Sequence, residues 1–333
     1  MEKPTPMNRQ SPYVSSNRSR REFLAGAGGL LLLGAAGCGG GGAGGGASSG
    51  GARTIEHKFG STEIEGSPER VVAVGYNESD FVLAAGVVPV GVRDFIGPFS
   101  EQDRAWAQDA LGGGRPELVG GTEIDFEAIS MLEPDLILGI YSFVTREDYE
   151  LLSEIAPTVA QPGRYADGAT PWQEQMRLTG RALGRDDRAK RVVKDVEARF
   201  AREKKTHPEF EGKTMAVVLA FDGAYTSLGP DDLRTLLFTS LGFGLPEETG
   251  EISSERLDLL DEDLLVVLGA KRETLQQDEI LQNLDVVRGG RTIYFGDFST
   301  PFSGALGYSS PLSLPFALDV SVPLMSEALS SNP

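Results

Sequence analysis

Residues 127–137 read EAISMLEPDLI, and residues 255–265 read ERLDLLDEDLL. The two segments carry Glu, apolar residues, Asp and an apolar pair at matching positions. In each, apolar residues at helical spacing are followed by a short run of Leu or Ile, which predicts a short helix leading into a buried strand. The chain therefore contains a weak internal repeat, one copy in each half.

A second correspondence extends the repeat. In both halves an apolar strand is followed by a loop and by a helix that ends at a glycine, a common C-terminal signal. The segments are strand 71–75 with helix 80–85 and Gly86, and strand 216–221 with helix 233–241 and Gly242. Together the two correspondences predict two related lobes.

Short runs rich in Val, Leu and Ile alternate with helical stretches along the rest of the chain. Continuous apolar strands between helices are typical of parallel sheets that are covered on both faces. The fold class is therefore α/β, and no run reaches transmembrane length. The predicted strands are residues 71–75, 88–92, 136–140, 216–221, 264–268 and 292–295.

Two helices are expected between the lobes. The sequence TPWQ at residues 170–173 is a helix-start signature, and that helix should end near Gly184. A second helix should begin at Asp186 or Asp187 and end near His207, with a length of roughly 30 Å for about 20 residues. It is either a stiff connection between the lobes or a covering helix of one lobe, and periodicity alone does not separate the two.

Composition excludes several classes of protein. Of 333 residues, 31 are basic and 49 are acidic, so the net charge of −18 repels nucleic acid. One Cys and two His cannot form a closed zinc site or an intrachain disulfide. His57 and His207 are also too few to bind a bare metal ion, and both are expected to be solvated.

The first 52 residues have the features of an export signal and a tether. Arg20-Arg21 precedes an apolar stretch that ends at Cys38, an arrangement that resembles a twin-arginine signal with a lipoprotein cleavage site. Residues 1–37 would be removed, Cys38 would be acylated, and the Gly/Ser-rich residues 38–52 would act as a flexible tether. The protein is thus expected outside the cytoplasm, anchored to the membrane by lipid.

Residues 53–330 resemble the substrate-binding lipoproteins of ABC importers for iron–siderophore complexes and cobalamin. The resemblance is carried by five segments in order: 68–74 (PERVVAV), 85–92 (AGVVPVGV), 133–138 (EPDLIL), 156–159 (APTV) and 289–294 (GGRTIY). It implies two Rossmann-like lobes with parallel sheets, joined by a single long helix. The expected boundaries are residues 53–170 for the N-terminal lobe, 171–206 for the bridging helices and 207–333 for the C-terminal lobe.

The resemblance also implies that Glu127 and Glu255 dock onto the membrane permease subunits of the importer. A Glu in a first helical turn is favoured by the helix dipole in any case, but equivalent placement in both halves favours docking.

Ligands of such sheets bind beyond the carboxyl ends of the strands. Arginine there would match the negative oxygens of a ferric siderophore, and aromatic rings would cover the backbone of the chelate. Arg93, Tyr141 and Arg146 are the first choices. The other candidates are Tyr76, Asn77, Phe95, Arg164, Tyr165, Phe221, Asp222, Tyr225, Phe298, Phe302 and Tyr308.

The resulting hypothesis is a monomeric extracytoplasmic protein that captures a ferric siderophore and delivers it to an ABC importer. It needs no cofactor and no metal ligand of its own, because the iron arrives already chelated. Cobalamin or haem is an alternative ligand. An exported enzyme on the same scaffold is a further alternative, although the sequence lacks a dinucleotide-binding Gly motif between a strand and a helix, G-x-S-x-G and H-E-x-x-H.

Overall fold

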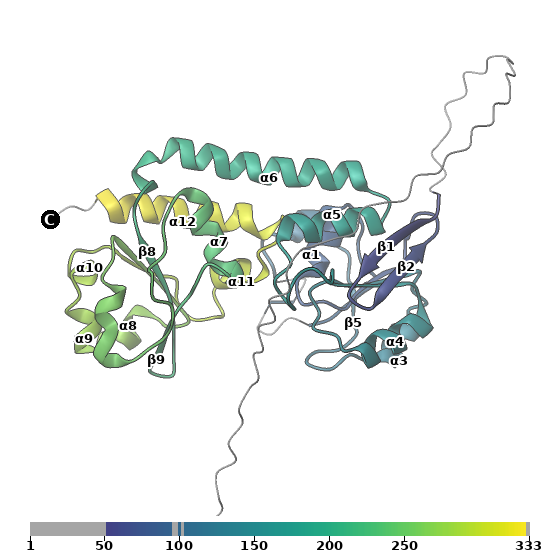
Figure 1. The fold of residues 1–333 in the computed structure, drawn as a ribbon, viewed down its shortest axis with the longest axis horizontal. Coiled ribbons are helices and arrows are strands. Elements are labelled where there is room, and N and C mark those ends of the chain that lie inside the picture. Colours follow the sequence, from purple (N-terminus) through teal and green to yellow (C-terminus); the bar gives the residue numbers. More distant parts are fainter. Residues whose placement is uncertain (1–50, 95–98, 101–102, 331–333) are drawn as a thin grey trace, which may run out of the picture. The chain divides into compact units, whose positions relative to one another are not determined.

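A computed structural model describes residues 51–94, 99–100 and 103–330 (Figure 1). The predicted signal at residues 1–37, the predicted acylation site Cys38 and the candidate ligand residue Phe95 lie outside these ranges. Among the described residues, no helix is long and apolar enough to cross a membrane.

The first sheet is parallel, as predicted. Its strand order is β5-β4-β3-β6-β7, and every neighbouring pair runs in the same direction. β3, β6 and β7 are buried at every position, which explains their continuous apolar sequences. The strands are β3 (Val71–Ala73), β4 (Gly91–Val92), β5 (Glu117–Leu118), β6 (Leu136–Gly139) and β7 (Thr158–Ala160).

Five helices and a hairpin accompany this sheet. Asp125 caps α3 by accepting a hydrogen bond from the Ala128 amide, and Thr145 and Asp148 form a capping box on α4. These caps fix the loops that leave the carboxyl ends of β5 and β6. The elements are β1 (Arg53–His57), β2 (Gly60–Ile64), α1 (Glu78–Ala84), α2 (Gln108–Leu111), α3 (Phe126–Met131), α4 (Arg146–Ile155) and α5 (Trp172–Ala182).

The second sheet is mixed, so the prediction of two parallel sheets is wrong for two of its strands. Its order is β10-β9-β8-β11-β12, in which β8, β11 and β12 are parallel while β9 and β10 are antiparallel to their neighbours. Asp222 and Gly223 have φ of 50° and 77° and turn the chain directly from β8 into β9. The strands are β8 (Met215–Phe221), β9 (Ala224–Ser227), β10 (Gly250–Ile252), β11 (Leu264–Leu268) and β12 (Thr292–Tyr294).

The predicted helix 233–241 begins as a 3-10 turn and ends, as expected, at Gly242, whose φ is 110°. The longest helix after it, α12, packs against α6, α7, α11 and the sheet strands β11 and β12. The elements are η1 (Pro208–Phe210), η2 (Leu233–Thr235), α7 (Leu236–Leu241), η3 (Ser254–Leu260), α8 (Arg272–Leu275), α9 (Glu279–Gln282), α10 (Asp285–Arg288), α11 (Pro301–Tyr308) and α12 (Ser313–Ser330).

Helix α6 (Asp186–Thr206) contacts both halves of the described chain (Figure 1). Near its start Arg188 donates a hydrogen bond of 2.7 Å to the Ala84 carbonyl at the end of α1, and further on Arg199 forms a 2.6 Å ion pair with Asp319 of α12. Helix α5, besides its contact with α6, packs against α1 and β1 of the first half. The lobe boundaries at residues 170 and 207 stay a prediction.

Candidate functional site

A cavity of about 420 Å³, here called the central cavity, is lined by residues from both halves. The first half contributes three aromatic side chains and Asp167, and the second contributes Asp231, Asp232 and Arg234. A volume of this size is within the range of small-molecule sites. Its lining residues are Tyr76, Tyr141, Phe143, Asp167, Gly168, Asp231, Asp232, Leu233, Arg234 and Gly307.

Tyr76 and Tyr141 lie together because the strands before them are neighbours. Each follows a parallel strand at its carboxyl end, β3 and β6 respectively, and the Tyr76 amide donates a 2.9 Å hydrogen bond to the Tyr141 carbonyl. Phe143 packs edge-on against Tyr141, with 5.4 Å between ring centroids, and its side chain is 49% exposed. The wall from the first half is therefore an aromatic surface open to a ligand.

A buried glutamate, Glu78, lies behind this wall at the start of α1. Its Oε1 accepts a hydrogen bond from the Tyr141 amide, while Oε2 has no hydrogen-bond partner among the described residues. Burial raises the pKa of Glu78 to about 7, against the opposing effect of backbone amides and Arg93. A Cβ at Gly75 would lie 1.5 Å from Oε2, so any larger residue there would displace the Glu78 carboxylate.

Arg93, a first choice for ligand binding, is 7% exposed and is occupied by the protein itself. It donates to the carbonyls of Gly121, Thr122 and Ser142, and its guanidinium carbon lies 4.5 Å from the centroid of the Tyr76 ring. Arg93 therefore supports the aromatic wall and ties three loops together.

The opposite wall of the central cavity contains Asp232 and Arg234. Asp232 caps η2, and its carboxylate accepts two hydrogen bonds from the Arg234 guanidinium, at 2.8 and 2.6 Å. Burial acts to raise the pKa of Asp232, but Arg234 lowers it below its usual value. Burial, and next the Asp232 charge, raise the pKa of the Tyr141 phenol. The phenol thus remains a neutral hydrogen-bond donor.

Asp231, Asp232 and Arg234 were not among the candidates taken from the sequence. The local signal was present, because Gly229-Pro230-Asp231-Asp232 is a typical turn followed by a helix cap. That signal indicates a turn, however, and not which cavity the turn borders. Asp167 and Phe143 were also missed, because local sequence does not indicate which cavity their loops border.

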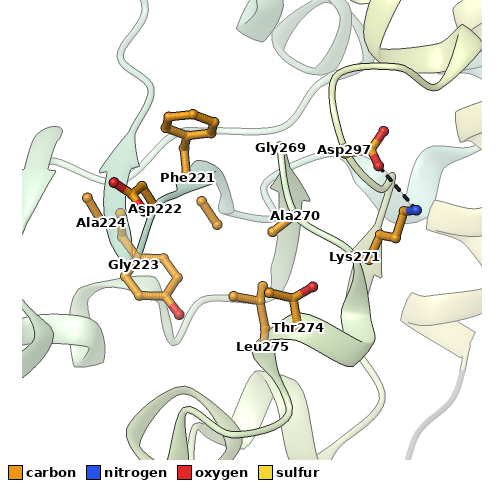
Figure 2. A pocket seen from close by; sticks show the side chains of 12 residues that line it. Phe221, Asp222, Gly223, Ala224, Gly269, Ala270, Lys271, Thr274, Leu275 and Asp297 are labelled. Carbon is orange, nitrogen blue, oxygen red and sulfur yellow. Dashed lines mark ion pairs between the residues drawn. The ribbon is translucent and has the colours of Figure 1, made fainter.

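A second hollow of about 410 Å³, here called the hairpin cavity, follows the carboxyl ends of β8 and β11. Figure 2 shows Phe221 and Asp222 on one side of it and the 3.3 Å ion pair between Lys271 and Asp297 on the other. Tyr225 also lines it, but this side chain is 4% exposed and its hydroxyl donates to Asp278. Phe298, which is 41% exposed, lies beside Phe221.

The remaining candidates do not line the central cavity. Phe302 and Tyr308 are buried core residues, and Asn77 is buried with its amide donating to the Tyr308 carbonyl. Arg146 lies over the Phe59 ring at 5.2 Å. Arg164 pairs with Glu174 and lies over the ring of its neighbour Tyr165. Of the predicted residues that the structure describes, only Tyr76 and Tyr141 line the central cavity, whereas Phe221, Asp222 and Tyr225 line the hairpin cavity.

The two histidines were expected to be solvated, and for His57 this is wrong. The His57 side chain is 7% exposed, shares a 2.9 Å hydrogen bond with the Thr62 hydroxyl and contacts the Tyr149 ring. Burial lowers the pKa of its imidazole. His207 is partly buried beside Glu209. No group of three or more His, Cys, Asp or Glu residues in the described part of the chain is arranged to hold a metal ion.

Glu127 and Glu255 occupy equivalent positions, as the repeat predicts. Glu127 lies in the first turn of α3 and Glu255 in the first turn of η3, and both side chains are exposed. Each short helix leads into a buried strand, β6 or β11. Two exposed carboxylates thus stand at the same place in the two halves.

Comparison with known proteins identifies the family. The family model described as periplasmic binding protein matches residues 71–297. The probable siderophore-binding lipoprotein YfiY of Bacillus subtilis is 28% identical over 72% of this chain and 78% of its own, and the Fe(3+)-citrate-binding protein YfmC of the same organism is 24% identical over 75% and 79%.

Solved structures agree with this match. A periplasmic solute binding protein from Mycobacterium smegmatis is 32% identical, with a TM-score of 0.76 over 84% of this chain and 99% of that one. The Streptococcus pneumoniae iron-uptake protein PiaA in complex with ferrichrome is 28% identical, with a TM-score of 0.70 and the same two coverages. The chain therefore belongs to the periplasmic binding protein family and is a substrate-binding protein of an ABC transporter, not an enzyme.

Proposed function

We propose that the protein captures a ferric siderophore in the central cavity and delivers it to an ABC importer. The observation that carries the proposal is the composition of this cavity. Tyr76, Tyr141 and Phe143 from one half line it together with Asp231, Asp232 and Arg234 from the other. A chelate bound there would contact both halves at once, so its binding would favour one arrangement of the two halves over others.

Ligands named for the relatives support iron chelates as the substrate class. YfiY is named for siderophores and YfmC for ferric citrate, and PiaA was solved with ferrichrome. The aromatic wall suits the organic backbone of such a chelate, and the neutral Tyr141 phenol can donate to one of its oxygens.

Delivery requires a place at the membrane and a docking surface. We propose acylation at Cys38, after export through the signal at residues 1–37, as the anchor; relatives such as YfiY are lipoproteins. The twin-arginine route and the monomeric state stay predictions. Glu127 and Glu255 are proposed to pair with basic residues of the permease subunits.

Calorimetric titration of the full chain tests the proposal. Saturable binding of at least one ferric chelate, with weaker binding of its iron-free form, is the expected result; cobalamin and haemin test the alternative ligands. Phe143→Ala should weaken binding about tenfold, the equivalent of 1.4 kcal/mol. Leu118→Ala, which removes another exposed apolar side chain outside the cavity, is the matched control. If no ferric chelate binds, the proposal is wrong.

A further inference from the structure

We infer that the central cavity selects its ligand by charge and takes an uncharged or cationic ferric chelate of the trihydroxamate type. Polyanionic chelates, such as tris(catecholate) or citrate complexes, would be disfavoured. This inference rests on the proposed function and narrows its substrate class. It differs from the expectation drawn from the sequence, in which arginines would bind negative oxygens.

Most charged residues that line the central cavity form ion pairs, and one carboxylate remains unpaired. Arg234 is held by both carboxylate oxygens of Asp232. Asp167 forms a 2.8 Å ion pair with Lys58. Asp231 is exposed and has no ion pair or hydrogen bond with a described residue, so the uncompensated charge on this lining is a carboxylate.

The other arginines that could bind an anionic ligand already contact other groups of the protein. The Arg93 guanidinium donates to backbone carbonyls behind the aromatic wall. Arg146 packs over Phe59, and Arg164 pairs with Glu174. Arg234 lines the cavity with its Nε and Nη2 bonded to Asp232, so an anion bound through its remaining N–H groups would lie close to that carboxylate and be repelled by it.

This charge pattern discriminates between iron chelates because the chelates differ in net charge. Three hydroxamates, each with one negative charge, neutralise iron(III), and a free ammonium group on the ligand makes the complex cationic. Three catecholates, each with two negative charges, leave a strongly anionic complex. Like charges a few ångströms apart repel, and the repulsion is stronger near a protein surface than in bulk water. The net charge of −18 acts in the same direction at longer range.

The test compares four iron(III) complexes on the full chain by calorimetry. They are ferrioxamine B, a linear trihydroxamate with an ammonium group; ferrichrome, which is neutral; iron tris(catecholate); and iron citrate. We expect the first two to bind at least about tenfold more tightly than the anionic pair, with a gap that narrows at high salt because the repulsion is screened.

Substitution of the unpaired carboxylate gives the sharper measurement. Asp231→Asn should reduce the ratio of ferrioxamine B affinity to tris(catecholate) affinity about threefold to tenfold, and Asp231→Lys should reduce it further. Asp258→Asn, an exposed acid on η3 outside the cavity, should leave the ratio unchanged. Circular dichroism verifies the fold of each variant.

The outcomes separate this inference from the function it rests on. If iron citrate or tris(catecholate) binds most tightly, the charge inference is overturned while the chelate-binding function stands. An affinity ratio that does not change in Asp231→Lys also overturns it. If none of the four complexes binds, the proposed function itself has failed.

Discussion

Ser310 donates a 2.5 Å hydrogen bond to the carboxylate of Asp80, although the two residues are 230 positions apart in the chain. Asp80 lies on α1, and Ser310 lies between α11 and α12. Both side chains are fully buried. The same carboxylate forms a 2.7 Å ion pair with Arg104 and accepts a 2.9 Å hydrogen bond from the Trp106 indole. Asp80 therefore joins the two halves through polar contacts of its side chain.

Asp80→Asn should lower the free energy of unfolding by about 3–5 kcal/mol, because it removes the carboxylate that neutralises the buried Arg104. Denaturant unfolding followed by circular dichroism measures this loss. Lys190→Ala, which breaks a well-exposed ion pair with Asp187, should change stability by less than about 1 kcal/mol. Equal effects of the two substitutions would show that the buried pair contributes little.

Glu78 should make stability depend on pH. Its pKa is raised to about 7 in the folded protein from an ordinary 4.5, so the folded state binds more protons between these values. Stability from this group is therefore full below pH 4.5 and falls as pH rises to about 7, by roughly 3 kcal/mol. Glu78→Gln, which mimics the protonated form, should lose this dependence.

Unfolding curves of the wild type and Glu78→Gln at several pH values check this prediction. The variant should gain stability relative to the wild type as pH increases from 4.5 to 8. Glu154→Gln, an exposed residue on α4, serves as the control and should follow the wild type. Parallel curves for Glu78→Gln and the wild type would mean that Glu78 is ionised in the folded state throughout this range.

Features encoded by local sequence were predicted well. β11 begins and ends at the predicted residues 264 and 268, and α6 spans Asp186–Thr206 close to its predicted limits. The burial of β11 follows from its continuous apolar sequence, and that of α6 follows from the helical spacing of its apolar residues. The family resemblance was informative for the same reason, because it rests on strand and turn segments.

The central cavity was predicted only in part, because its walls come from segments distant in sequence. Tyr76 and Tyr141 follow apolar strands and could be placed by topology. Whether an arginine is available to a ligand depends instead on tertiary partners. Arg93 follows a strand as expected, yet neighbouring carbonyls occupy its donors. Asp231 lies after a hairpin strand that was not predicted, so its position could not be deduced.

The turn between β8 and β9 was readable in principle. Asp222-Gly223 is a strong hairpin signal, because two-residue turns of this kind need positive φ at both positions. Gly223→Ala should lower stability by about 1 kcal/mol, since φ is 77° there and no neighbouring atom would contact the added methyl. Thermal unfolding measures the loss. Gly121→Ala, also in open space but without a positive φ, should be nearly neutral; a similar loss there would point to a cause other than the turn.

Glu127→Ala combined with Glu255→Ala should abolish import of the bound chelate while leaving its affinity unchanged. Both carboxylates are exposed and neither lines the central cavity. Uptake of radioactive iron by cells that carry the variant, together with calorimetry on the purified protein, provides the two readouts. Glu150→Ala with Glu273→Ala removes one exposed acid from each half at other sites and should preserve import. Reduced affinity in the first double variant would place those residues in ligand binding instead of docking.

Arg146→Ala and Arg164→Ala test directly whether arginines recognise the chelate. Arg146 lies over Phe59 and Arg164 pairs with Glu174, so neither guanidinium lines the central cavity. Each variant should change ligand affinity by less than about twofold, whereas Tyr141→Ala, which removes part of the aromatic wall, should weaken it about tenfold. Calorimetry on the three proteins decides between the two modes of recognition. A large loss in either arginine variant would mean that the bound form draws that arginine into the site, and that recognition by positive charge contributes after all.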